Sequence, residues 1–498
     1  MKIKKLVKDI PDIQVKGSKD IEITGVCCNS KLVSPGNLFV AKKGKAHDGS
    51  QYIPEAISAG AVAVLTDIYD PSLKEITQLI HSDVRLMEGL IAANYYQFAA
   101  DELFMIGITG TNGKTTTSFL LKHMIDKLAG PCGVIGTVEY IIGKHRYQAT
   151  LTSPDVITNH KLLREMVLQD CKSAVMEVTS HALEQGRVNY IDFDIAVFTN
   201  LTVDHLDYHQ TMDNYCNAKQ KLFKSLKNKP KRDAKKTFPK VAVINGDSPW
   251  KDKIIEGCTA KILTYAIDHS ADLRATDIHM NSDHSTFTLN YHNQKIECKS
   301  PLVGRYNVYN VLAACLTMLA RGFSLETIAP MISTFVPVPG RLERVSNKLN
   351  LKIYVDFAHT DDALINVLEC LRELKPNKII TVFGCGGDRD QTKRPKMAQA
   401  CEELSDISIV TSDNPRSEDP KVIAEHILKG FKRKDSHTVE LDRHKAIENA
   451  INMATADDIV LIAGKGHEPY QIFAHKIIEF DDRKVAAQIC QNKFNSKQ

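Results

Sequence analysis

The 498-residue sequence lacks the features that would place it in a membrane, on an export route or on nucleic acid. No apolar run approaches the ~18 residues of a transmembrane helix, and no apolar segment of signal-peptide length follows the basic N-terminus. The net charge of +4 is small for this length and argues against a nucleic-acid partner. We therefore expect a cytoplasmic protein without a membrane span.

Paired cysteines are missing as well. The 12 cysteines are scattered and no C-x-x-C occurs, although Cys27 and Cys28 are adjacent. Structural zinc sites and redox dithiols use such pairs, so the sequence predicts reduced thiols, many of them in cores. The one strongly basic stretch, Lys224 to Lys240, carries no aromatic residue except Phe238. This composition favours a solvated surface loop over a nucleic-acid or membrane contact.

A phosphate cradle is present. The apolar run Phe104 to Ile108 predicts a strand, and Phe119 to Leu128 has the apolar period of a helix. The intervening glycines let backbone N–H groups approach phosphate, while a lysine adds charge and a threonine hydroxyl can ligate Mg2+. The strict Walker pattern would need glycine where this chain has Ile108. The cradle residues are Gly110, Thr111, Asn112, Gly113, Lys114, Thr115 and Thr116.

Polar residues follow the next probable strands. Glu177 lies in the apolar run from Ala174, His205 follows the run from Ile195, and Lys219 lies on a probable helix. A carboxylate and an imidazole beside a phosphate cradle suit a divalent metal. Each residue alone is better explained as a hydrogen-bonded polar side chain, and only their joint occurrence after the cradle favours a metal site.

Two asparagines, Asn307 and Asn310, lie three residues apart on a further predicted helix. Two amides could bind the edge of an adenine, and helix capping by Asn307 is an equally good explanation. The proline-rich segment Val336 to Gly340 then predicts a linker or hinge.

Four strands are predicted after this linker. Each is followed by glycine or charged residues at its carboxyl end, as in a doubly wound domain. Arg389 and Arg416 are forked donors suited to a carboxylate, and Glu468 or Asp413 could hold an ammonium group. This set predicts a site for a zwitterionic amino acid, with surface salt bridges as the alternative. The segments are Asp356 to Thr360, Gly384 to Asp390, Ser412 to Arg416 and Gly464 to Glu468.

The length of the chain indicates about three domains. We expect an α/β fold with a small N-terminal α/β domain at residues 1–101. A central P-loop-type mononucleotide-binding domain with a parallel sheet would occupy residues 102–337, and a C-terminal Rossmann-like domain residues 338–498.

These motifs together resemble those of the Mur ligases of cell-wall precursor synthesis, and within that family the MurE type. The resemblance covers essentially the whole chain, and the family's cradle also lacks the first Walker glycine. The matching motifs are T-G-T-N-G-K-T-T at Thr109–Thr116, M-E-V-T-S-H-A-L at Met176–Leu183, T-N-L-T-V-D-H-L-D-Y-H at Thr199–His209, G-R-Y-N-V-Y-N at Gly304–Asn310, P-G-R-L-E at Pro339–Glu343, G-C-G-G-D-R-D at Gly384–Asp390 and G-K-G-H-E at Gly464–Glu468.

The resemblance implies an ATP-dependent ligase that uses about two Mg2+ ions. Lys114, Glu177, His205 and Lys219 would be catalytic. Metal ligands would be Thr115, Glu177, His205 and Lys219, the last after carbamylation by CO2. Besides the cradle, ATP would contact Asn307, Asn310, Arg341, Asp356 and His359.

The resemblance also implies two further binding sites. A UDP-sugar dipeptide would lie on Ser30, Thr152, Ser153, Thr179, Gln185 and Arg187. The amino acid would lie on Arg389, Asp413, Asn414, Pro415, Arg416, Gly464 and Glu468.

The tetrapeptide D-N-P-R, Asp413 to Arg416, resembles the branch that adds meso-diaminopimelate, because its arginine can clasp the far carboxylate of that amino acid. The branch that adds L-lysine usually lacks this arginine. Three departures affect the sugar and ribose contacts: Asn29-Ser30-Lys31 replaces the usual D-S-R, Thr179 replaces serine, and Phe357 to Asp361 differs around A-H-T.

The predicted function is ATP-dependent addition of meso-diaminopimelate to UDP-N-acetylmuramoyl-L-alanyl-D-glutamate through an acyl phosphate, in peptidoglycan synthesis. The predicted partners are these small molecules, and the expected state is a monomer. Two alternatives within the enzyme class are a relative that adds lysine or another amino acid and a folylpolyglutamate-type synthetase. A nucleotide-gated binding protein without synthetase activity is the alternative from another class.

Overall fold

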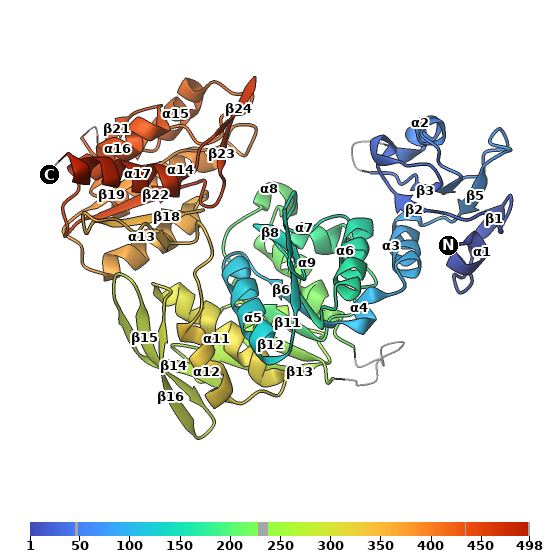
Figure 1. The fold of residues 1–498 in the computed structure, drawn as a ribbon, viewed down its shortest axis with the longest axis horizontal. Coiled ribbons are helices and arrows are strands. Elements are labelled where there is room, and N and C mark those ends of the chain that lie inside the picture. Colours follow the sequence, from blue (N-terminus) through green and yellow to red (C-terminus); the bar gives the residue numbers. More distant parts are fainter. Residues whose placement is uncertain (45–47, 228–237, 434, 497–498) are drawn as a thin grey trace.

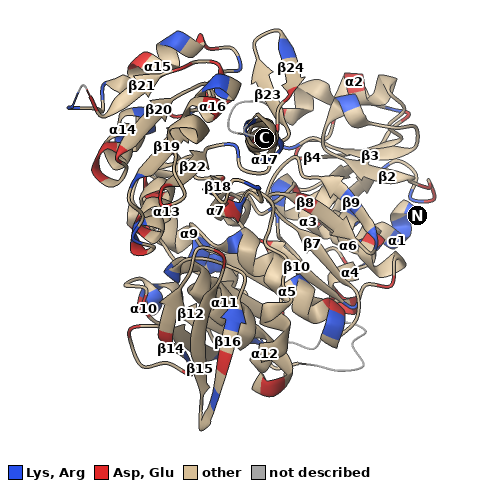
Figure 2. Ribbon diagram, turned by 60° about the vertical axis from the view of Figure 1, so that its left-hand side comes forward, with Lys and Arg blue, Asp and Glu red and all other residues tan. Residues whose placement is uncertain are grey.

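Three main sheets follow one another along the chain in the computed structural model, which describes residues 1–44, 48–227, 238–433 and 435–496. In Figure 1 the N-terminal residues lie to one side in blue, the middle of the chain is green to yellow, and the C-terminal residues are orange to red. Figure 2 shows basic and acidic segments interspersed, in keeping with the small net charge. No helix among the described residues is long and apolar enough to cross a bilayer.

The N-terminal unit is a five-stranded sheet with the order β1-β5-β4-β3-β2, in which only β1 is antiparallel to its neighbour. A helix, α2, ends just before Gly60, and the strand β4 follows it. Its elements are α1 (Ile3–Leu6), β1 (Gln14–Lys16), β2 (Gly25–Cys27), β3 (Asn37–Val40), α2 (Ile53–Ser58), β4 (Ala63–Thr66), β5 (Thr77–Ile80) and α3 (Val84–Tyr95), with short 3-10 turns at Ser30–Leu32 and Gly49–Tyr52.

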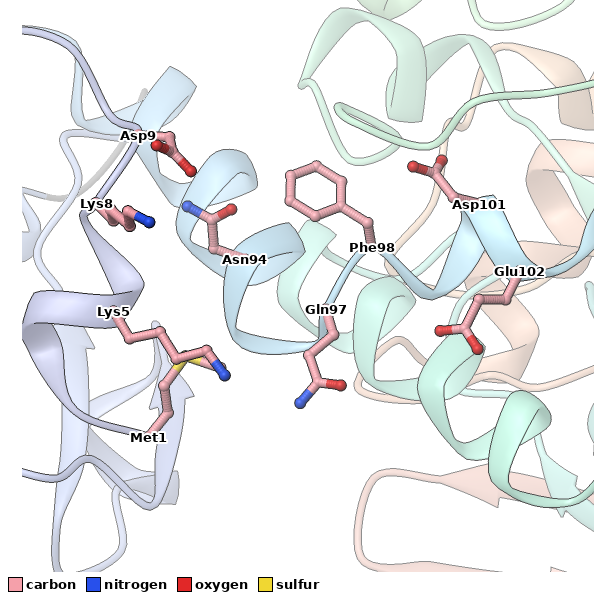
Figure 3. Close-up of a pocket in the computed structure, with 9 residues that line it drawn as sticks. All are labelled: Met1, Lys5, Lys8, Asp9, Asn94, Gln97, Phe98, Asp101 and Glu102. Carbon is pink, nitrogen blue, oxygen red and sulfur yellow. The ribbon is translucent and has the colours of Figure 1, made fainter. Parts of the chain in front are cut away.

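The connection from this unit to the next turns at two consecutive left-handed residues, Gln97 (φ 57°) and Phe98 (φ 49°). Arg164 spans the turn, because its guanidinium donates to Tyr96 O at 2.9 Å, to Gln97 O at 3.0 Å and to Glu102 Oε1 at 2.8 Å. A cavity of about 260 Å3 lies at this junction, and Figure 3 shows the side chains around it. The backbone path between the two units is thus fixed by one arginine.

The central unit contains an eleven-stranded sheet of order β16-β15-β14-β13-β12-β11-β6-β10-β7-β8-β9. Its elements are α4 (Ala99–Glu102), β6 (Phe104–Thr109), α5 (Lys114–Leu128), β7 (Cys132–Ile135), β8 (Glu139–Ile142), β9 (His145–Gln148), α6 (Val156–Leu168), β10 (Ser173–Glu177), α7 (Ser180–Glu184), β11 (Ile195–Phe198), α8 (Leu206–His209), α9 (Met212–Lys224), β12 (Val241–Asn245), α10 (Lys251–Ile254), β13 (Lys261–Ala266), β14 (Leu273–Met280), β15 (Ser285–Tyr291), β16 (Gln294–Ser300), α11 (Arg305–Ala320) and α12 (Leu325–Ser333).

The predicted parallel sheet is confirmed for the seven strands from β14 to β7, and antiparallel strands extend it at both edges. Side chains of β14 and β15 alternate between the core and solvent, as half-buried strands do. Most of the basic stretch, residues 228–237, lies outside the described residues. At its end Lys240 is buried and pairs with Asp192 and Asp194 at 2.8 and 3.1 Å.

Apolar side chains cover both faces of the central parallel strands. One face packs against α5, α11 and α12, whose buried residues include Leu121, Met124 and Val311. The other packs against α6 and α9, with Leu163 and Phe223 in its core. Because both faces are covered, the free ends of the parallel strands are the places left for polar chemistry.

The C-terminal unit has a six-stranded sheet of order β17-β18-β22-β19-β20-β21, parallel except for β17, and a hairpin of β23 and β24. All four strands predicted here are present. Its elements are β17 (Glu343–Arg344), β18 (Lys352–Asp356), α13 (Asp361–Glu373), β19 (Ile379–Phe383), α14 (Lys393–Leu404), β20 (Ile407–Val410), α15 (Pro420–Leu428), β21 (His437–Val439), α16 (Arg443–Met453), β22 (Ile459–Ala463), β23 (Tyr470–Phe473), β24 (Lys476–Glu479) and α17 (Asp482–Asn495). Each main sheet lies within one of the three predicted domain ranges, whose boundaries stay a prediction.

Candidate active site

The phosphate cradle lies at the carboxyl end of β6, in the middle of the central sheet. The predicted strand and helix are confirmed, since β6 ends at Thr109 and α5 begins at Lys114. Gly110 and Gly113 have φ angles of 153° and 85°, which disfavour other residues. A Cβ at Gly110 would lie 1.9 Å from Thr199 Oγ1, and one at Gly113 2.2 Å from Asn310 Oδ1. Backbone angle and close packing therefore both require glycine.

The loop after β11 holds the cradle from the side. Asn200 accepts a hydrogen bond from Asn112 N on its Oδ1 at 2.8 Å and one from Thr111 N on its carbonyl at 3.0 Å. Thr199 Oγ1 donates to Asn112 O at 2.6 Å. These bonds fix the shape of the cradle without a ligand, which lowers the entropy that binding must remove.

Two lysines converge on one carbonyl oxygen of the cradle. Lys114 Nζ donates to Gly110 O at 2.8 Å, and Lys219 Nζ, from α9, donates to the same oxygen at 2.9 Å. Lys219 is buried against the ring of Tyr215, with its Nζ 4.4 Å from the ring centroid. Burial, and then the nearby charge of Lys114, hold the pKa of Lys219 well below its usual value of 10.5. A neutral, nucleophilic amine is thereby favoured at this position.

Glu177 lies on the other side of the cradle, at the end of β10, and is fully buried. It accepts hydrogen bonds from Thr115 Oγ1 at 3.0 Å, from Thr137 Oγ1 at 2.9 Å and from Thr137 N at 3.1 Å. His205 has a left-handed backbone (φ 55°), and its Nε2 lies 3.3 Å from Asp204 Oδ2. The segment after His205 is the short helix α8, in which His209 forms a hydrogen bond with Ser180 Oγ at 2.9 Å.

A cavity of about 730 Å3 opens in front of the cradle and is lined by residues of the central and C-terminal units. Glu177, Lys219 and Gly110 are not among the residues that line it. Arg341 Nη2 reaches Thr115 Oγ1 at 3.5 Å, and Asp356 accepts hydrogen bonds from Leu342 N and Ala358 N at 2.6 and 2.7 Å. The predicted residues that line the cavity are Thr111, Asn112, Gly113, Lys114, Thr115, Thr116, Thr152, Thr179, His205, Asn307, Asn310, Arg341, Asp356 and His359.

The two asparagines of α11 form a short chain of hydrogen bonds. Asn307 Nδ2 donates to Val303 O at 2.8 Å, and Asn310 Nδ2 donates to Asn307 Oδ1 at 2.9 Å. The residue that caps α11 is Gly304, so the alternative in which Asn307 caps this helix is wrong. Both side chains instead border the cavity beside Gly113.

Most residues expected to bind the UDP-sugar dipeptide are linked to Glu177. Thr152 Oγ1 lies 3.1 Å from Thr137 Oγ1, and Ser153 Oγ donates to Glu177 O at 2.8 Å and to Thr179 Oγ1 at 3.3 Å. Arg187 donates to Ser153 O at 2.8 Å and to Gln185 Oε1 at 2.7 Å. Ser30 lies apart in the N-terminal unit, and no hydrogen bond among the described residues joins it to the other five.

The residues expected to bind an amino acid gather elsewhere, at the carboxyl ends of β19, β20 and β22. Asn414 Nδ2 donates to Glu468 Oε2 at 2.7 Å, and a Cβ at Gly464 would lie 2.5 Å from Asp413 Oδ2. Burial, and then the charge of Asp413, raise the pKa of Glu468. None of the seven predicted residues lines the 730 Å3 cavity.

The guanidinium groups of Arg389 and Arg416 donate to backbone carbonyls, those of Asp388 at 3.2 Å and of Gly387 at 2.8 Å. The described residues place no carboxylate oxygen within 4.0 Å of either group, so surface salt bridges do not account for these two arginines.

Comparison with known proteins decides the family. Three family models match in order along the chain: "Mur ligase family, catalytic domain" at residues 22–96, "Mur ligase middle domain" at 108–318 and "Mur ligase, glutamate ligase domain" at 340–466. Together they match more than half of the sequence. The chain belongs to the Mur ligase family.

Curated relatives of this Mur ligase are similar over almost their full lengths. A Chlamydia pneumoniae protein named UDP-N-acetylmuramoyl-L-alanyl-D-glutamate--2,6-diaminopimelate ligase is 43% identical over 474 residues, 95% of each chain. A protein of the same name from Geobacillus kaustophilus (strain HTA426) is 42% identical over 98% of each chain.

Solved structures have the same architecture. One of UDP-N-acetylmuramoyl-L-alanyl-D-glutamate--2,6-diaminopimelate ligase superposes with a TM-score of 0.69 at 33% identity over 99% of each chain. The structure of MurF from Acinetobacter baumannii, at 20% identity, has a TM-score of 0.66 over 93% of this chain and 95% of its own. The second match supports the fold alone.

Two residues of this Mur ligase site were not singled out from its sequence. Asp362, at the start of α13, accepts hydrogen bonds from Asn112 Nδ2 at 2.9 Å and Thr202 Oγ1 at 2.7 Å, and so joins the C-terminal unit to the cradle. Thr137 connects Glu177 to Thr152. A weak signal for Asp362 is its place two residues after the A-H-T segment, whereas nothing local marks Thr137.

Proposed function

We propose that this Mur ligase uses ATP to attach meso-diaminopimelate to UDP-N-acetylmuramoyl-L-alanyl-D-glutamate, a step of peptidoglycan precursor synthesis, through an acyl phosphate. The observation that carries the substrate assignment concerns Arg416, which shares a loop with Asp413 and Asn414. Among the described residues, the hydrogen bond of its guanidinium goes to the carbonyl of Gly387. A forked donor in the same group of loops as two carboxylates, Asp413 and Glu468, suits an amino acid with a carboxylate at each end. Similarity to relatives named for this reaction supports the same assignment.

In this proposal the phosphates of ATP lie on the cradle, between Lys114 and the start of α5. The backbone N–H groups at the start of a helix attract an anion, and Lys114 adds a compact positive charge. Asn307 and Asn310 would contact the adenine, and Arg341, Asp356 and His359 would contact the ribose and phosphates from the C-terminal side. Closure of the two units about residues 336–340 would exclude water from the reacting groups.

The donor set fits Mg2+. Thr115 Oγ1 and the Glu177 carboxylate are hard oxygen ligands beside the cradle, and His205 lies on the opposite lip. The described residues contain no cluster of three His, Cys, Asp or Glu side chains that would enclose an ion, as expected where phosphates and water complete the coordination. Bound Mg2+ would neutralise charge on the transferring phosphoryl group.

Lys219 fits carbamylation. Its amine is buried, its pKa is lowered by burial, and it lies on the same carbonyl as Lys114. A carbamate would replace a second positive charge with a negative one, so Lys114 would become the main cation of the cradle. The modified side chain would provide an oxygen ligand for a second Mg2+ ion.

The chain's own residues then have the following parts in the reaction. Thr152, Ser153, Thr179, Gln185 and Arg187, with Ser30 from the N-terminal unit, hold the UDP-sugar dipeptide so that its terminal carboxylate reaches the γ-phosphate. Lys114 stabilises the negative charge as the acyl phosphate forms.

The second half of the reaction takes place at the C-terminal strands. Arg389 and Arg416 clasp carboxylates of diaminopimelate, and Asp413 and Glu468 hold its ammonium groups, with Asn414, Pro415 and Gly464 shaping the site. The amine attacks the activated carbonyl and inorganic phosphate leaves. We further propose that the protein works in the cytoplasm as a monomer, with these small molecules as its only partners.

The test is phosphate release by the purified protein with ATP, Mg2+ and UDP-N-acetylmuramoyl-L-alanyl-D-glutamate, with meso-diaminopimelate or L-lysine added in parallel. Release with diaminopimelate and little with lysine is the expected result. Release with lysine alone would keep the ligase and overturn the role of Arg416. Release with neither would overturn the proposed reaction and favour a folylpolyglutamate-type synthetase or a binding protein.

A further inference from the structure

The two loops that carry Arg389 and Arg416 contact each other closely. Gly387 N donates to Asn414 O at 2.9 Å, and a Cβ at Gly387 would lie only 1.8 Å from Pro415 O. Ser417 donates to the Asp388 carboxylate, from its Oγ at 2.5 Å and from its N at 3.3 Å. The spacing of the two guanidinium groups is therefore set by how the loops are joined.

One ion pair, between a buried arginine and a partly exposed glutamate, lies at this junction and has no part in the reaction described so far. Arg394, in the first turn of α14, is fully buried and donates two hydrogen bonds to Glu418, at 2.8 Å to Oε1 and 2.9 Å to Oε2. Glu418 Oε1 also accepts a hydrogen bond from Asp388 N at 2.6 Å. A single carboxylate thus joins α14, the loop of Arg389 and the loop of Arg416.

The pair acts on the guanidinium of Arg416 through the backbone that supports it. Arg416 Nη1 donates to Gly387 O, and a Cβ at the preceding Gly386 would lie 2.8 Å from that nitrogen. Arg394 Nη2 reaches Gly386 O at 3.4 Å. Arg416 itself has a left-handed backbone (φ 53°), and its N donates to Ile472 O at 3.0 Å. Its side chain therefore rests on the segment that Arg394 and Glu418 hold in place.

We propose that Glu418, oriented by Arg394, is a positioning residue that sets the separation of Arg389 and Arg416 and thereby selects an amino acid with a carboxylate at each end. The inference rests on the proposed function, because it assigns these two arginines to diaminopimelate. Forked recognition of two carboxylates on one molecule tolerates errors of only about half an ångström, whereas a single carboxylate leaves the second arginine unused. Loss of the Arg394–Glu418 pair should therefore weaken the binding of diaminopimelate more than the binding of lysine.

The chain offers a matched control at the opposite ends of the same two strands. Asp406 Oδ2 accepts hydrogen bonds from Arg372 Nη2 at 2.8 Å and from Ile379 N at 2.7 Å, just before β19 and β20 begin. Like the Glu418 contact, this one joins an arginine and a backbone N–H to a single carboxylate, although Arg372 is more exposed than Arg394 and bonds one oxygen only. It lies away from both arginines that bind substrate. Asp406→Asn therefore reports what an arginine–carboxylate contact contributes to the unit in general.

The experiment compares Glu418→Gln with Asp406→Asn in the phosphate-release assay. Glu418→Gln should raise the KM for meso-diaminopimelate about tenfold, with kcat and the KM for ATP within about twofold of the wild type. Asp406→Asn should leave all three values within about twofold. The inference would be overturned if Glu418→Gln raised the KM for ATP as much as the KM for diaminopimelate. It would also be overturned if both variants raised the KM for diaminopimelate equally.

A milder pair of variants covers the case in which Glu418→Gln does not fold. Ser417 is exposed, and Ser417→Ala removes the hydroxyl bond to Asp388 while Ser417→Thr retains a hydroxyl. We expect Ser417→Ala to raise the KM for diaminopimelate about threefold and Ser417→Thr to restore it. Unchanged KM in Ser417→Ala would overturn the inference, and a wild type inactive with diaminopimelate would overturn the proposed function as well.

Discussion

The carboxyl ends of the central and C-terminal sheets both present positive side chains, but they hold them differently. In the central unit Lys114 and Lys219 share one carbonyl oxygen, and Lys219 is buried. In the C-terminal unit Arg389 is exposed and Arg416 partly so, and each donates to a different carbonyl of the loop below. Two positive groups at one point suit the stabilisation of phosphate charge, whereas two separate guanidinium groups suit the recognition of a substrate with two carboxylates.

The largest effect expected from this comparison is the loss of catalysis at the central sheet. Lys114→Ala and Glu177→Ala should each lower kcat by about a thousandfold or more, because charge on the transferring phosphoryl group would no longer be neutralised. Phosphate release measures this, and circular dichroism with a thermal scan checks that each variant is folded. Normal turnover by either folded variant would remove the cradle from the mechanism.

A smaller effect is expected at the C-terminal sheet. Arg416→Ala should raise the KM for meso-diaminopimelate about a hundredfold and leave the KM for ATP unchanged, because one forked contact with a carboxylate is lost. Arg416→Lys retains the charge and loses the fork, so it should recover only part of the affinity. Equal activity of Arg416→Lys and the wild type would mean that charge alone matters, as it does in the cradle.

The contact between the two units provides a third test. Asp362→Ala removes the acceptor for Asn112 and Thr202 and should lower kcat about fivefold, since the C-terminal unit would be less well held over the cradle. Asp361→Ala, in the same first turn of α13, loses a similar interaction with the helix dipole and serves as the control. Equal losses in the two variants would point to the helix start and not to the contact with the cradle.

The smallest expected effect concerns Lys219 and depends on pH. Because burial lowers its pKa in the folded chain, the unfolded chain binds the proton more strongly between that pKa and 10.5, and wild-type stability rises with pH across this interval. Lys219→Met has no amine that must lose its proton when the chain folds, so it should unfold about 2–4 °C above the wild type at neutral pH, without CO2 or metal. This gap should close toward pH 10. A gap independent of pH would show that packing, not charge, separates the variants.

The parts of the fold that could be predicted are those whose signal is local. The apolar run from Phe104, the glycines at 110 and 113 and the helix after them form one continuous segment, and the strand ending at Phe383 with its glycine loop is another. The parallel strands β6, β10 and β11 follow from such segments. Strand β14 and the antiparallel strands β15 and β16 carry half-polar alternation, which indicates that they are strands but not which sheet they extend.

The candidate site, like the fold, could be predicted where its signal is local. Lys114 and Glu177 belong to motifs, and the structure places them on opposite sides of Thr115. Asp362 lies 250 residues from Asn112, which it contacts, and the carboxylate of Glu418 joins three separate segments. No periodicity or motif encodes such distant pairings, because they arise only when separate units pack. The roles of the site residues stay predictions until the variants above are measured.

The two outer strands of the eleven-stranded sheet bear on how the protein behaves in concentrated solution. An unpaired strand edge is a template on which another chain can add a strand and start aggregation. β9 is exposed along its whole length and carries Arg146, while β16 carries Lys295 and Lys299. Charged side chains on a sheet edge oppose such pairing. The antiparallel additions therefore shield a long, apolar parallel sheet from polymerising edge to edge during folding.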